Sequence, residues 1–333
     1  MIHFTPSFAH QSRHNFSDNY LPYNKPFGVK HWLNATRDTL NETIIVLADY
    51  DTILFKPFSI NSGTHDLRYG GSRDLMTVTD TVKPGQAMSA DWSMFLKAGV
   101  WNKPEKLAIL CKDKPCMNVS KADASEYYTP TGPPYIMHIN DMRDFIQDYC
   151  DFAIHHREID RGWMSEMHAF ALAAANNDIK FTVLADLGIT VPQERNPRMY
   201  WSFVDDLTQN PCLDSVTSIT NEELSLDMLP TAIHMCKKYP GIMLGNLTYS
   251  YYKYHLPRNV MQCQGPLLKM PPSEIWDVAD TQVNRRDARA GAWVQCTVIR
   301  YINSVLKPYK RASCPNGYNL EKTFPMLDPM YSE

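Results

Sequence analysis

Two aspartates, two residues apart, are the residues of the sequence that could most clearly take part in chemistry. Asp49 and Asp51 flank Tyr50 and directly follow the apolar run at residues 44–48. Side chains at positions i and i+2 of an extended chain point to the same side. Where a strand ends, both carboxylates can therefore reach one divalent cation, which prefers oxygen ligands. Aspartates in such a place also serve as turn or capping residues, and the spacing alone leaves that alternative open.

Two further residues could join such a site, and each has a plainer alternative. Glu166 lies among apolar residues near the start of an alanine-rich stretch. A desolvated carboxylate there suits acid–base or electrostatic work, but a helix dipole also favours Glu in the first turn. His234 lies in an apolar stretch, where a hydrogen-bonded core histidine is the common finding, although neutral imidazole suits Mn²⁺ beside carboxylates. His155 and His156, by contrast, are predicted to lie on a solvated, charged helix.

The elements that must position these residues alternate between helix and strand. Apolar periodicity and β-branched runs are the signals used, and residues 59–90 are rich in Gly, Ser, Thr and Asp and are predicted to be loop-like. Such alternation favours an α/β fold. In the first part of the chain we expect an amphipathic helix at 27–40, a buried strand at 44–48 and an extended segment at 52–55. A turn at 131–134 should precede a strand at 135–137 and a helix capped by Asp141. The last expected elements are an alanine-rich helix from about Trp163, a strand at 181–185 and a helix at about 293–306.

Composition excludes several classes of protein. The chain has 333 residues, of which 44% are hydrophobic and 21% charged, and its formal net charge is −3. Such a chain can bury one large core or two modest ones, and it carries no basic field for a nucleic-acid backbone. No apolar run approaches the ~20 residues that a membrane-spanning helix needs, so no membrane segment is expected in this chain.

Cysteines and sequons bear on the compartment. There are eight cysteines, and Cys111 and Cys116 flank a short turn and could close a local loop. Buried free thiols of a cytosolic enzyme are the alternative. Five Asn-x-Ser/Thr sequons favour a lumenal protein; they begin at Asn15, Asn34, Asn41, Asn118 and Asn246.

Several segments, taken in order, resemble a known family. Nearly end to end, the chain is similar to the plant and algal peptidyl-serine α-galactosyltransferases, and more distantly to the hydroxyproline O-arabinosyltransferases. No single segment is specific, and the resemblance rests on their order and spacing. The segments that carry it are 23–26, 31–33, 45–51, 132–136, 166–171, 233–239, 252–257 and 314–318.

The resemblance implies a GT-A-type (Rossmann-like) α/β fold that binds a UDP-sugar through Mn²⁺ or Mg²⁺. Asp49 and Asp51 match the acidic metal-binding motif of the family, and His234 matches the C-terminal histidine that completes the metal site. Glu166 matches the acidic residue of the acceptor-side helix. Its implied role is first positioning or electrostatic and second proton transfer, because members of the family retain anomeric configuration.

The resemblance also implies substrate contacts, partners and a location. The residues expected to bind substrate are Asn24, Lys25, Gly132, Tyr135 and Trp163, with Gly132 and Tyr135 beside the donor sugar. The expected partners are a UDP-sugar donor and a protein acceptor with a Ser or hydroxyproline hydroxyl, and the expected location is the lumen of the Golgi or ER. Residues 1–245 would form the catalytic core, lacking the first nucleotide-binding strand of the family, and residues 246–333 a Tyr-, Pro- and Cys-rich extension packed on it.

Two other functions compete with this hypothesis. The first alternative is a non-catalytic module that binds carbohydrate or protein. A transferase fold that lacks its first strand would also lack the nucleotide-binding site, and it could serve as such a module. The second alternative is a metal-dependent hydrolase that uses Asp49, Asp51 and His234 around an activated water.

Overall fold

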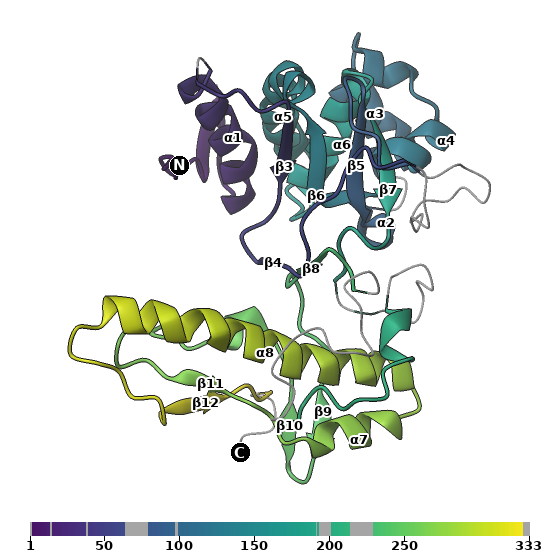
Figure 1. Ribbon diagram of the computed structural model, residues 1–333. Coiled ribbons are helices and arrows are strands. Elements are labelled where there is room, and N and C mark those ends of the chain that lie inside the picture. The colour runs from purple at the N-terminus through teal and green to yellow at the C-terminus, as the bar shows by residue number, and fades with distance from the viewer. Residues whose placement is uncertain are drawn as a thin grey trace. The chain divides into compact units, whose positions relative to one another are not determined.

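The protein has a mixed α/β architecture built as two units (Figure 1). A computed structural model describes residues 2–13, 15–37, 39–63, 79–96, 99–190, 192, 201–213 and 229–328. Unit 1 comprises Met1–Asp49 and Phe58–Gly188, and unit 2 comprises Tyr50–Pro57 and Ile189–Glu333. The chain therefore passes from unit 1 to unit 2 between Asp49 and Tyr50, within the predicted metal motif.

A four-stranded sheet forms the centre of unit 1. Its order is β3 (Ile44–Leu47), β6 (Thr131–His138), β5 (Gln86–Asp91) and β7 (Lys180–Leu184). β6 is antiparallel to both of its neighbours, whereas β5 and β7 run parallel. Alternation along β6 divides its side chains between two hydrophobic clusters: Tyr135 and Met137 join one and Ile136 the other.

Two helices pack against the face of the sheet that carries Tyr135. They are α5 (Ile139–Ile159) and α6 (Ser165–Asn176). The ring of Tyr135 stacks on Phe170 of α6 with centroids 3.8 Å apart, and Phe170 meets Tyr149 of α5 edge to face at 5.2 Å. The apolar run of α6 is buried because sheet and α5 both cover it. The other helices of unit 1 are α1 (Asn24–Ala35), α2 (Ser93–Leu96), α3 (Pro104–Leu110) and α4 (Lys121–Asp123).

A buried ion pair ties the N-terminal hairpin to α5. The hairpin pairs β1 (His10–Arg13) with β2 (Phe16–Asn19). Asp18 accepts two hydrogen bonds from the Arg157 guanidinium, at 2.6 and 2.8 Å. The same guanidinium lies 4.3 Å from the ring centroid of Tyr20. Because a two-pronged pair fixes its partners in orientation as well as distance, it also positions Tyr20.

Unit 2 is organised around one long helix, α8 (Arg285–Ser313), with α7 (Glu274–Asp280) before it. Its strands form three small sheets. β4 (Thr52–Leu54) pairs antiparallel with β8 (Ala232–His234), β9 (Ile242–Leu244) pairs antiparallel with β10 (Leu247–Tyr249), and β11 (Leu267–Lys269) runs parallel to β12 (Thr323–Pro325). The β4–β8 pair brings the chain just after Asp51 beside His234, because Thr52 lies opposite His234 in its register.

Three disulfides are present. Cys111–Cys116 closes the local loop that the sequence suggested, and Cys212–Cys296 and Cys263–Cys314 link distant parts of unit 2. Cys150 and Cys236 are free thiols. Among the described residues, no helix is both long and apolar enough to cross a membrane.

Some predicted elements are confirmed and others need correction. The strand at 44–48 exists, but β3 lies at an edge of the described sheet and Val46 is 41% exposed, so the strand is not buried. The expected turn at 131–134 is instead the first half of β6, which accommodates a cis peptide between Pro133 and Pro134 and an irregular register with β5. Proline and glycine are poor strand residues, which is why the pattern favoured a turn.

The ends and surroundings of helices were harder to predict. His138, not Asp141, caps α5, with its Nδ1 accepting the Asn140 amide at 3.2 Å, while Asp141 accepts the amide of Gly85. The helix expected at 27–40 is α1, shifted toward the N-terminus, and the last helix is much longer than predicted. His156 is only 2% exposed, so the predicted solvated position is wrong for it.

The loop predicted at 59–90 is partly a strand, and the predicted domain boundary at residue 245 is not tested. Residues 86–90 belong to β5 rather than to a loop, and 64–78 lie outside the described residues. Unit 2 contains residues on both sides of position 245. The boundary drawn there from composition and resemblance stays a prediction.

His156 and His168 make the stability of unit 1 dependent on pH. Their rings stack with centroids 5.0 Å apart, and burial lowers the pKa of each to about 4. Asp160, which faces the pair, opposes this shift, whereas Lys103 and Lys106 add to it. An unfolded chain protonates histidine near pH 6.5. The free energy of unfolding should therefore fall as pH drops from about 6.5 to 4, by up to about 3 kcal/mol for each ring.

Urea unfolding followed by tryptophan fluorescence at pH 7 and pH 5 measures this effect. The double variant His156→Gln/His168→Gln should lose most of the pH dependence. His155→Gln, on the neighbouring and more exposed position of the same helix, should keep it. Equal pH dependence in all three proteins would contradict the assignment.

Candidate metal and ligand site

The segment Asp49-Tyr50-Asp51, called the acidic turn below, joins β3 to β4. It follows β3 directly, as the sequence predicted. Tyr50 is 94% exposed, so the ring between the two aspartates contributes little to either core. With a single residue between them, the chain itself keeps the two carboxylates close.

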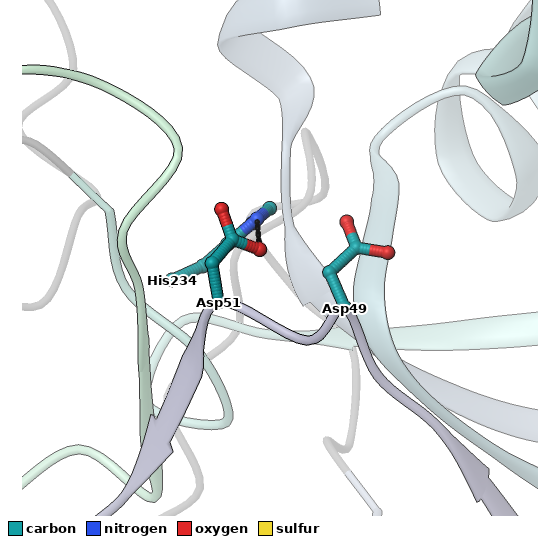
Figure 2. A group of neighbouring side chains, drawn as sticks. All are labelled: Asp49, Asp51 and His234. Carbon is teal, nitrogen blue, oxygen red and sulfur yellow. Dashed lines mark hydrogen bonds and ion pairs between the residues drawn. The ribbon is translucent and has the colours of Figure 1, made fainter. Parts of the chain in front are cut away.

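His234 completes a group of three possible metal ligands with the acidic turn. Its Nε2 lies 3.0 Å from Oδ1 of Asp51, which is the interaction marked in Figure 2. One ligand atom from each of Asp49, Asp51 and His234 lies within 4.8 Å of the other two. The β4–β8 pairing explains the short distance, since the amide next to His234, that of Met235, donates to the carbonyl of Asp51 at 2.9 Å.

Asp51 has a second partner in unit 2. The ammonium of Lys253, in the short helical turn Lys253–His255, donates to Oδ2 of Asp51. Burial alone would raise the pKa of Asp51, but its hydrogen bonds with His234 and Lys253 outweigh burial and hold that pKa well below its usual range. Asp51 is therefore a carboxylate at neutral pH.

In unit 1, Lys25 joins Asp49 to Glu166. Its Nζ lies 2.8 Å from Oδ1 of Asp49 and 3.4 Å from Oε2 of Glu166. Burial would lower the pKa of Lys25, but the two carboxylates outweigh burial and raise it. One ammonium group thus serves two carboxylates, and Lys25 stays charged.

Glu166 is held by hydrogen-bond donors on both oxygens. Tyr149 donates to Oε1, and Lys25 lies against Oε2. The backbone amide of Glu166 donates to Oη of Tyr20 at 3.0 Å, and that hydroxyl in turn donates to the carbonyl of Trp163. Burial raises the pKa of Glu166, with Lys25 opposing. The carboxylate is fixed in one position, which suits an electrostatic role.

The predicted substrate-binding residues fall in different surroundings. Asn24 is exposed, and its Oδ1 accepts the amide of Phe8 at 2.6 Å. Trp163 is 68% exposed and meets Tyr20 edge to face. Tyr135 is 1% exposed, and a Cβ on Gly132 would lie 1.9 Å from the ring of Trp92. Gly132 and Tyr135 therefore have packing roles, and their contact with a donor sugar stays a prediction.

The sequence did not single out Tyr20, Tyr149 or Lys253. Tyr149 lies among apolar residues of α5, and a phenol in such surroundings gives no sign in the sequence of a polar partner. Lys253 lies in segment 252–257, which carries the resemblance, but no individual role was predicted for it. The pairing of β4 with β8 brings His234 beside Asp51, and the Lys253 contact appears only in the folded chain.

The donor set fits a divalent cation of the Mn²⁺ or Mg²⁺ class. Two carboxylates and an imidazole nitrogen are ligands that Mn²⁺ accepts. His234 Nε2 and Asp51 Oδ1 bond each other at 3.0 Å, and the three ligand atoms lie within 4.8 Å of one another. The lysines at Asp49 and Asp51 supply positive charge where a bound cation would.

No family model, curated protein or solved structure matches the chain. The chemistry of this site is therefore the basis for inferring a function.

Lys25 is predicted to be the main electrostatic support of the site in unit 1. Lys25→Met leaves two carboxylates without their shared ammonium, and should lower the free energy of unfolding by about 3 kcal/mol, because a buried charge loses its partner. Lys30→Met on the same helix, where the lysine bonds an exposed glutamine, is the matched control and should cost much less. Chemical denaturation measures both.

A second variant separates charge from packing. Glu166→Gln in the Lys25→Met background removes one of the two carboxylates and should recover part of the lost stability. A double variant as unstable as the sum of its parts would contradict the electrostatic explanation.

Proposed function

We propose that this protein is a metal-dependent retaining glycosyltransferase. It transfers a sugar, galactose or arabinose, from a UDP-sugar to a Ser or hydroxyproline hydroxyl of a protein. The observation that carries the proposal is the group Asp49, Asp51 and His234, with oxygen, oxygen and nitrogen ligand atoms within 4.8 Å of one another. The resemblance of the ordered sequence segments supplies the reaction class.

Each of these residues has a role in the proposal. Asp49, Asp51 and His234 hold Mn²⁺ or Mg²⁺, and the ion, when bound, neutralises the charge that develops on the leaving diphosphate. Asp51 is ionised at neutral pH, since its partners lower its pKa. His234 is 4% exposed, and its burial limits the orientations open to the ring.

Glu166 is proposed as an electrostatic and positioning residue. Both of its oxygens already accept from Tyr149 and Lys25, so it has little freedom to carry a proton to or from a substrate. In a retaining reaction the oxygen of the leaving diphosphate can take the proton of the acceptor. Exposed Trp163 and Asn24 are then available for substrate contact, and Lys25 follows Asn24 in sequence.

The fold and the covalent features support the same proposal. A mixed sheet with the acidic turn directly after one strand supports a GT-A-type fold. Three disulfides and the exposure of all five sequon asparagines support a protein of the Golgi or ER lumen. The sequon asparagines are Asn15, Asn34, Asn41, Asn118 and Asn246.

One observation favours a second candidate, a non-catalytic binding module. Lys25 pairs with Asp49 and Lys253 pairs with Asp51, so each carboxylate of the acidic turn is already neutralised by the chain itself. A site of that kind can be stable without a metal ion. Binding of UDP and Mn²⁺ decides between the two candidates.

Thermal unfolding with UDP, in the presence and absence of Mn²⁺, is the direct test. At a hundredfold excess over the dissociation constant, UDP should stabilise the protein by about 2.7 kcal/mol in the presence of Mn²⁺. Without Mn²⁺ the shift should be much smaller, because the diphosphate would lack its main counter-charge. Asp51→Asn should abolish the Mn²⁺-dependent shift.

Asp277→Asn, at an exposed position of α7 in the same unit, is the matched control and should keep the shift. Absence of any shift in folded wild-type protein would favour the binding module over the enzyme. A shift of equal size in Asp51→Asn would place the ligand elsewhere.

A further inference from the structure

Lys253 occupies an unusual position for a surface lysine. Its ammonium donates to Oδ2 of Asp51, a carboxylate whose side chain is only 9% exposed, while the lysine side chain itself is 19% exposed. His234 takes the other oxygen of the same carboxylate. Both oxygens of Asp51 are thus engaged by donors from unit 2.

Aromatic rings surround the ammonium group. Nζ of Lys253 lies 5.2 Å from the ring centroid of Tyr254 and 5.8 Å from that of Tyr50. These two rings are 67% and 94% exposed. Contacts between a cation and an aromatic face are attractive at such distances. The ammonium can therefore leave Asp51 and still stay close to the acidic turn.

A divalent cation on Asp51 would weaken this ion pair. Lys253 contacts Oδ2 of a proposed metal ligand whose Oδ1 faces His234, and two positive charges on one carboxylate repel each other. That repulsion favours release of Lys253 from Oδ2. Its positive charge then needs a new partner, and a ligand that arrives with the cation and carries negative oxygens would provide one.

We propose that Lys253 exchanges partners: it neutralises Asp51 when no divalent cation is bound, and donates to an oxygen of a diphosphate when cation and diphosphate are bound together. The ligand class is a diphosphate, such as that of a UDP-sugar. This inference rests on the proposed function but adds a residue to it. Lys253 is the counter-ion in one state and the anion-binding group in the other.

The proposal predicts opposite effects of one substitution on two ligands. Lys253→Gln removes the competing ammonium, so Mn²⁺ alone should bind about threefold more tightly. The same change removes a charge-assisted hydrogen bond to the diphosphate, so UDP at saturating Mn²⁺ should bind at least about tenfold more weakly. Isothermal titration calorimetry measures both affinities without any turnover.

Two controls accompany the variant. Lys253→Arg keeps the charge and should leave UDP affinity much closer to that of the wild type. Lys307→Gln, at an exposed position of α8, should change neither affinity. Equal weakening of Mn²⁺ and UDP by Lys253→Gln would show a merely structural role and overturn the proposal, as would unchanged UDP affinity.

The same titrations separate this inference from the proposed function. If the wild-type protein binds Mn²⁺ and UDP and Lys253→Gln leaves UDP affinity unchanged, only the exchange of partners is overturned. Wild-type protein that binds neither ligand overturns both.

Discussion

A buried carboxylate needs a counter-charge, and this requirement governs the arrangement of the site in both units. Lys25 meets it for Asp49 and Glu166, and Lys253 together with His234 meets it for Asp51. Each unit therefore satisfies its own carboxylates. Removing water strengthens these interactions and raises the cost of an unpaired charge. The backbone that carries the pairs is correspondingly fixed: the Asp18–Arg157 pair and Tyr20 locate Glu166, and the β4–β8 ladder locates His234 beside Asp51.

This arrangement explains how an acidic turn can be preorganised and still accept a metal ion. The two lysines hold the carboxylates in place, so a cation that replaced them would meet ligands that are already positioned. In the turn Tyr50 is exposed, whereas the side chain of Asp51 is only 9% exposed. Glu166, by contrast, has both oxygens committed to the core, which suits a fixed negative charge rather than a proton carrier. The proposed exchange by Lys253 follows from the same electrostatic requirement.

The sequence predicted part of this site because local pattern and chemistry coincide there. A β-branched run followed by Asp-x-Asp predicted the strand and the acidic turn, and the apolar stretch around His234 marked it as a candidate ligand or core histidine without predicting its strand. Long-range pairing could not be predicted: nothing local shows that Thr52 lies opposite His234, that β3 is an edge strand, or that Tyr149 bonds a glutamate on the next helix. Gly132-Pro133-Pro134 misled because these residues usually break strands, and here the sheet accommodates them. His156 misled because its neighbours in sequence are charged, although one of them, Arg157, is itself buried through its pair with Asp18.

The central claim, that Asp49, Asp51 and His234 bind one divalent cation, can be tested by pulsed electron paramagnetic resonance on Mn²⁺-loaded protein. One bound Mn²⁺ per chain, with nitrogen modulation from a single imidazole that disappears in His234→Ala, is the predicted result. Bound Mn²⁺ without nitrogen modulation, or modulation that persists in His234→Ala, would contradict the account, as would the absence of any bound Mn²⁺.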